Sequence, residues 1–94
     1  HNRIVGGIVI AEITSKLTLE PYIENDNFLL VKFTFDGEEY KFEEPLIYGI
    51  KTCYEMALRI IERIKSHYKL TFIEQDELYK YIYREILIKL SVGE

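Results

Sequence analysis

The sequence predicts an α+β domain in which a four-stranded antiparallel β-meander is followed by two α-helices packed on one face of the sheet. Three observations predict this order of elements. Short β-branched and aromatic runs, separated by turn residues, fill the first half of the chain. Residues 52–68 place apolar side chains at the spacing of one helical face. A second stretch with helical spacing occupies the C-terminal part of the chain.

The composition is that of one globular domain. The chain has 94 residues, of which 48% are hydrophobic and 30% charged, and this suffices for a single core over residues 1–94. Glu and Lys dominate the charged residues, and Trp is absent. This usage is typical of hyperthermophiles, and the chain is similar in composition to small proteins of hot-spring archaea and their viruses. We therefore expect a thermostable protein.

Charge and cysteine content exclude several classes of function. The formal net charge is −4, which argues against non-specific binding to nucleic-acid phosphates. The single cysteine rules out an internal disulfide and a cysteine-based metal cage, and Cys53 falls on the apolar face of residues 52–68. No apolar run reaches the roughly 18 residues of a membrane span, so we expect an intracellular protein.

Four strands are expected, at residues 4–13, 17–23, 28–35 and 38–43. Asp36-Gly37 is a strong signal for a two-residue hairpin turn, which places Phe33 opposite Tyr40 on the core face. A three-residue loop at 25–27 keeps the apolar residues of the second and third strands on this same face, because a one-residue slip would reverse them. A three-residue connection at 14–16 aligns Ile13 with Leu17 in the same way.

Residues 52–68 form the most regular stretch, and we expect the sheet to pack on them. The apolar positions recur three and four residues apart, at Cys53, Met56, Ala57, Ile60, Ile61, Ile64 and Tyr68. Thr52 with Glu55 has the pattern of a capping box, and Glu55 is placed to pair with Arg59 on the exposed face. Gly49 is the expected bend in the connector that precedes this helix.

The second helix is expected to begin within residues 72–76 and to end near Leu90. Two caps are possible for its first turn, either Thr71 with Glu74 or the acidic residues that begin at Glu74. Its core stripe follows the helical period at Leu78, Tyr79, Ile82, Tyr83, Ile86, Leu87 and Leu90.

No group of residues has the spacing that catalysis, metal binding or cofactor binding requires. His67 lies near the end of a helix, where it serves as a partner of the helix dipole. The pairs Glu38-Glu39 and Glu43-Glu44 are adjacent on strands, so each pair points to opposite faces and does not converge. We therefore expect a non-enzymatic protein with no catalytic residue, cofactor or metal site.

An excess of apolar positions predicts self-association. On the second helix, Tyr81, Ile88 and Val92 line up on the side opposite the core stripe. On the first expected strand, Ile8 and Ile10 point away from the core. Two elements that are apolar on both sides favour a symmetric interface between two copies. We expect a homodimeric protein-binding or regulatory module that has these five residues in its interface.

A second interpretation comes from a short motif. Three antiparallel strands lead into a helix that opens Gly49-x-x-Thr52-x-x-Glu55-x-Ala57. This arrangement, which covers about a third of the chain, resembles the HicB-like antitoxin domain. The resemblance implies a partial ribonuclease-H-like fold and binding to a toxin partner.

A third interpretation is a dimer that binds nucleic acid. Arg59, Arg63 and Lys65 lie on the exposed face of the main helix and could contact phosphates. Glu55 and Glu62 lie among them and would neutralise part of their charge.

Overall fold

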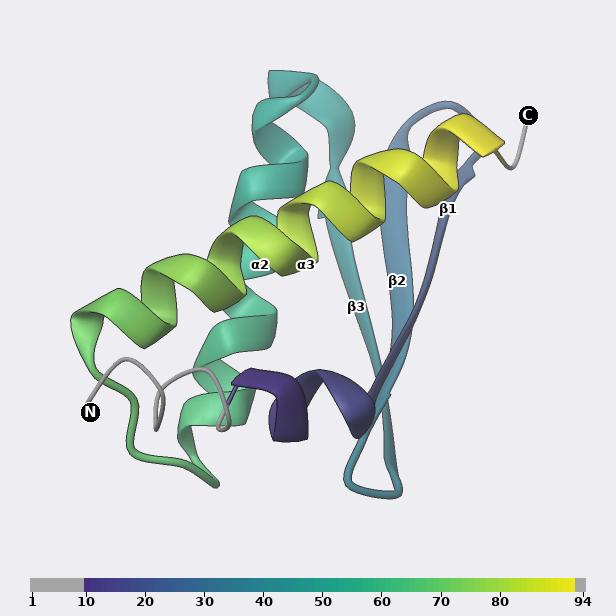
Figure 1. The fold of residues 1–94 in the computed structure, drawn as a ribbon. Coiled ribbons are helices and arrows are strands. Elements are labelled where there is room, and N and C mark those ends of the chain that lie inside the picture. Colours follow the sequence, from purple (N-terminus) through teal and green to yellow (C-terminus); the bar gives the residue numbers. More distant parts are fainter. Residues whose placement is uncertain (1–9, 93–94) are drawn as a thin grey trace.

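The protein has an α+β fold with one antiparallel sheet, as the sequence predicts, but the part of the chain that the structure describes forms three strands and not four. The computed structural model describes residues 10–92. The strands lie side by side in chain order and are β1 (Leu17–Glu24), β2 (Phe28–Phe35) and β3 (Glu38–Pro45). They are followed by a 3-10 turn and two helices, η1 (Leu46–Tyr48), α2 (Lys51–Lys65) and α3 (Phe72–Val92). Both helices lie on one side of the sheet, and α3 crosses α2 (Figure 1).

The predicted register of these three strands is confirmed. Phe33 pairs with Tyr40 across a two-residue turn, and the two rings stack at 4.9 Å between centroids. Asp36 and Gly37 both have positive φ, 52° and 85°, as the mirror-image hairpin turns require. The loop between β1 and β2 has three residues, Asn25 to Asn27, and it pairs Leu19 with Phe33. Turn chemistry and period-two alternation therefore agree on one register.

The first predicted strand is wrong where the structure describes it. Residues 10–15 are helical, and the remaining residues of that strand, 4–9, lie outside the described residues. Ile10 and Ile13 both pack on the core, three residues apart as on a helix, whereas Ala11 is exposed. The predicted alignment of Ile13 with Leu17 across a hairpin is therefore absent. Packing of Ile13 in the core outweighs the β propensity of this stretch.

The predicted core face of α2 is confirmed. Its buried apolar residues are Cys53, Met56, Ala57, Ile60, Ile61 and Ile64. Tyr68 lies beyond the end of the helix, but it is half-buried and still packs on the core. These side chains meet the buried residues of the sheet, so the core lies between the sheet and the two helices.

The predicted cap of α2 and the predicted partner of Arg59 are both wrong. Thr52 is buried inside the helix, and its hydroxyl donates to the carbonyl of Pro45 at 3.2 Å. Arg59 pairs with Glu44 of β3, at 2.6 Å, and not with Glu55. The 3-10 turn and Gly49, at φ 60°, set the start of α2 against the end of β3. This tertiary contact provides partners that local spacing does not reveal.

One of the two predicted caps of α3 is confirmed. The backbone N–H of Glu74 donates to the hydroxyl of Thr71 at 3.1 Å, and the N–H of Thr71 donates to the Glu74 carboxylate at 2.8 Å. This reciprocal pair is a capping box. In the predicted core stripe of α3, Leu78, Ile82 and Ile86 are fully buried and the other four residues are half-buried against the core.

Candidate functional site

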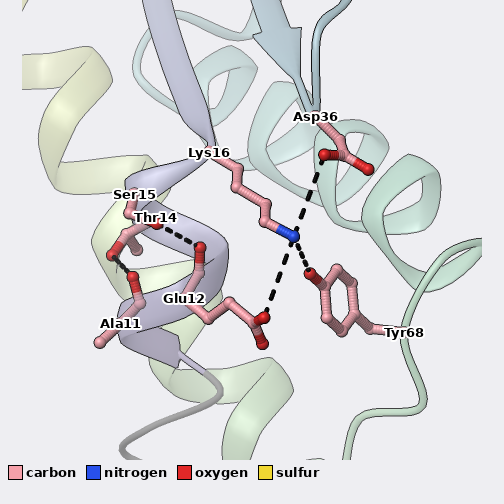
Figure 2. A network of polar contacts seen from close by, with 7 residues as sticks. All are labelled: Ala11, Glu12, Thr14, Ser15, Lys16, Asp36 and Tyr68. Carbon is pink, nitrogen blue, oxygen red and sulfur yellow. Dashed lines mark hydrogen bonds and ion pairs between the residues drawn. The ribbon is translucent and has the colours of Figure 1, made fainter.

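A network of polar contacts surrounds Lys16 (Figure 2). Its ammonium group donates to the hydroxyl of Tyr68 at 3.0 Å. The carboxylates of Glu12 and Asp36 each lie 3.9 Å from the same nitrogen. The partners come from the N-terminal helical segment, from the β2–β3 turn and from the link between α2 and α3. One side chain therefore ties together three segments that are distant in sequence.

The electrostatics of this network indicate a structural role. The hydrogen bond to Tyr68, followed by the charges around it, raises the pKa of Lys16 above its ordinary value. A catalytic lysine needs the opposite shift, because only the neutral amine is a nucleophile or a base. The network also has a backbone component, since the N–H of Asp36 donates to the carbonyl of Lys16 at 3.2 Å. Lys16 thus holds the base of the sheet to the N-terminal helical segment and to the link between α2 and α3.

The cations proposed for nucleic-acid contact are engaged within the fold. Arg59 donates to the carbonyl of Glu43 at 3.1 Å and lies 4.4 Å from the ring centroid of Phe42. Arg63 lies 5.0 Å from the ring centroid of Tyr40. Lys65 pairs with its helical neighbour Glu62 at 3.3 Å. The two arginines cover the aromatic edge of the core, as long cationic side chains do when their stems pack on apolar surface.

Three tyrosines form a stack between α2 and α3. The rings of Tyr54 and Tyr83 lie 4.1 Å apart at 15°, and Tyr79 extends the stack at about the same tilt. The contact of the Tyr83 hydroxyl with that of Tyr54, followed by burial, raises the pKa of Tyr83 to about 12. Burial raises the pKa of Tyr79 as well. The three stacked rings act as packing between the two helices.

Cys53 and His67 lie in packing environments. Burial raises the pKa of the Cys53 thiol, which disfavours the reactive thiolate. His67 places its ring edge-on against Phe35, 5.5 Å between centroids. Within residues 10–92, no group of three or more His, Cys, Asp or Glu side chains is arranged to hold a metal ion.

The predicted dimer residues differ in how far they are exposed. Ile88 and Val92 are exposed, at 54% and 78%, near the C-terminal end of α3. Tyr81 and Ile10 are each half-buried and pack against the core. Ile8 lies outside the described residues. The predicted stripe on α3 is therefore reduced to two aliphatic residues near the end of the helix.

Two apolar surfaces were missed in the sequence. The connector between β3 and α2 exposes Ile47, Tyr48 and Ile50, which stand in the run Leu46–Ile50. The sheet face that points away from the helices exposes Tyr22 and Phe28. The connector could have been found from its apolar run. The sheet face could have been found too, because the predicted register already places Tyr22 and Phe28 on the side opposite Leu19 and Phe33.

Surface depressions of the described residues are open and shallow. One, of about 310 Å³, lies over the outer side of the sheet at Glu20, Lys32 and Lys41. Another, of about 260 Å³, is lined by Phe42, Arg59, Glu62 and Arg63. Both mix charges of opposite sign, and neither brings an acid and a base together in an enclosed cavity.

Comparison of the chain with protein-family models, with curated proteins and with solved structures found no match. None of the helices described here has the length and apolar content needed to cross a bilayer.

Proposed function

We propose that the protein works as a non-enzymatic homodimeric binding or regulatory module, and that it comes from a hyperthermophile or its virus. Exposed apolar side chains carry this proposal. In residues 10–92, eleven large hydrophobic residues are at least 37% exposed, from Tyr22 on β1 to Val92 on α3. Burying them against a partner would gain roughly 25 cal/mol per Å² of apolar area. The polar groups around Lys16, Arg59 and Thr71, by contrast, are engaged within the fold.

The dimer is tested by measuring the mass of the wild-type chain in solution. Light scattering over a dilution series from high to low micromolar should give twice the chain mass of 11.2 kDa at the upper end. The mass should fall with dilution to that of one chain if the dimer is reversible. A chain that stays monomeric at high micromolar concentration would exclude the homodimer.

A second candidate is a HicB-like antitoxin domain that binds a toxin. It is supported by the three antiparallel strands that lead through η1 directly into α2. Its short motif is less supportive, because Thr52 is bonded to Pro45 and does not cap the helix. Such a domain binds a toxin, which is a second protein. A monomeric wild-type chain would therefore favour this candidate over the homodimer.

A further inference from the structure

We propose that the sheet face opposite the helices is the dimer interface, and that its occupant is the same face of a second copy, related by a two-fold axis along β2. This inference rests on the proposed homodimer and names the surface that forms it. We call this surface the open face. It lies on the side of the sheet away from α2 and α3 (Figure 1), and its residues alternate along each strand with those that face the core.

An apolar cluster occupies one end of the open face. Leu30 is only 1% exposed although it points away from the helices, and Tyr22, its partner on β1, stands beside it. Phe28 lies two residues from Leu30 on β2, so both share this face, and Phe28 pairs with Pro45 of β3. Tyr22 and Phe28 are each 37% exposed. Leu30 thus forms the floor of an aromatic surface that the helices do not cover.

Charged residues in the next row make the open face complementary to itself. The register aligns Glu20, Lys32 and Lys41 across the three strands. None of these three side chains forms an ion pair within residues 10–92. Glu20 and Lys41 are two strand spacings apart, about 10 Å, which is too far for a direct pair in one chain. Their charges are therefore available to a second molecule.

A two-fold axis along β2 satisfies both features at once. Two sheets stacked face to face in this way keep each row in place and exchange β1 with β3. Glu20 then faces Lys41 of the partner subunit, and the symmetric contact forms a second time. Tyr22 faces Glu43 of the partner subunit, where its hydroxyl can donate to the carboxylate. Phe28 meets its own counterpart on the axis, above the buried Leu30. Lys32 also meets its counterpart on the axis. Its long side chain can turn towards Glu20 of its own chain or towards Glu20 of the partner subunit.

The edges of the sheet are obstructed, so association through the sheet would use its open face. On β1, the carbonyl of Leu19 accepts a hydrogen bond from Lys89 of α3 at 2.9 Å. On β3, the carbonyl of Glu43 accepts one from Arg59. Pro21 of β1 has no N–H to offer to an added strand. Cations and proline on edge strands are the usual means by which sheets avoid edge-to-edge pairing.

A pair of matched substitutions locates the interface. Phe28→Glu should give a folded monomer, because it places two like charges near the two-fold axis. Phe72→Glu, at an exposed position that begins α3, is the same substitution away from the open face and should remain dimeric. Ile88→Glu should also remain dimeric. Light scattering gives the mass, and far-UV circular dichroism confirms that each variant is folded.

A charge exchange tests the two-fold arrangement directly and leaves the apolar cluster intact. Glu20→Lys alone and Lys41→Glu alone each place like charges opposite each other, so each should weaken the dimer at least about tenfold. An equimolar mixture of the two variants restores opposite charges at both contacts. Native mass spectrometry should therefore show the mixed dimer in excess over either homodimer.

The outcomes separate this inference from the proposed function. A monomeric wild type overturns both. A dimeric wild type whose mass is unchanged by Phe28→Glu, or whose charge variants do not prefer each other in the mixture, overturns the open-face interface and leaves the homodimer standing. In that case dissociation by Ile88→Glu would place the interface on α3. If Phe28→Glu fails to fold, the charge exchange alone decides whether the open face forms the interface.

Discussion

Substitution of Ile60 by Ala measures how much of the stability depends on α2. Ile60 is 0% exposed and belongs to the core that α2 shares with the sheet. Truncation of a buried large aliphatic side chain costs about 2–5 kcal/mol, because transfer energy is lost and a cavity is left behind. The total free energy of unfolding of such a domain is roughly 5–15 kcal/mol. Ile60→Ala should therefore lower the midpoint of a denaturant melt strongly without changing its slope.

The same helix provides a matched control. Leu58 lies two residues away in α2 and is 48% exposed, so Leu58→Ala removes a similar aliphatic group at a similar place in the helix. Ala is also the strongest helix former, which offsets part of the loss. We expect Leu58→Ala to cost about 1 kcal/mol or less. Equal costs for the two variants would mean that burial on α2 does not hold this fold together.

Two further predictions concern α3. Thr71→Ala removes the hydroxyl of the capping box and should lower the free energy of unfolding by about 0.5–2 kcal/mol in a denaturant melt, whereas Thr71→Ser should retain most of it. Tyr83, whose pKa is raised to about 12, should ionise near that pH, so a titration followed by tyrosinate absorbance should lose its transition near 12 in Tyr83→Phe. Because the folded-state pKa is raised, the stability that Tyr83 contributes is complete below pH 10 and is lost as the pH rises to about 12. The free energies of unfolding of the wild type and of Tyr83→Phe should therefore converge across this range.

The three-stranded part of the fold could be predicted because independent local signals agree there. Asp36-Gly37 fixes a two-residue turn, and the alternation of β2 then permits one register. The core face of α2 was predictable for a similar reason, since its apolar period has no competing interpretation. Where turn residues and the spacing of apolar residues indicate the same structure, the sequence alone predicts it.

The N-terminal segment shows where local reasoning fails. Its β-branched residues predict a strand, yet residues 10–15 are helical. The spacing of Ile10 from Ile13, and of Glu12 from Lys16, was compatible with a helix throughout. What selects the helix is tertiary, because Ile13 enters the core and Lys16 reaches Tyr68, 52 residues away. A single sequence does not show which distant surface a segment will meet.

The candidate surfaces were harder to predict than the fold, because they depend on which groups remain unpaired after folding. Arg59 and Arg63 form an exposed basic stripe on a helical wheel, but β3 provides partners for both. Tyr22 and Phe28 lie on the face away from the helices, where the predicted register already places them, but only the folded chain shows that they stay exposed there. The charge and the position of the surface that remains available follow from the strand register and not from composition.

Arg59 gives the sharpest test of this difference. As an exposed helix residue it would cost about half a kcal/mol or less when changed to Ala. In the structure its guanidinium bonds Glu44 at 2.6 Å, bonds the edge carbonyl of Glu43 and lies over Phe42. The side chain remains 44% exposed, so solvent screens the ion pair, and about 1 kcal/mol is the expected loss for Arg59→Ala.

Arg84→Ala is the matched control, since Arg84 is exposed on α3 and has no ion-pair partner within residues 10–92. A double-mutant cycle of Arg59→Ala with Glu44→Ala isolates the pair, and the coupling energy should be roughly 0.2–1 kcal/mol and smaller at high salt. If Arg59→Ala proved as mild as Arg84→Ala, and the cycle gave no coupling, Arg59 would not be engaged with β3. Its charge would then be free for phosphate, and the nucleic-acid interpretation would regain its main residue.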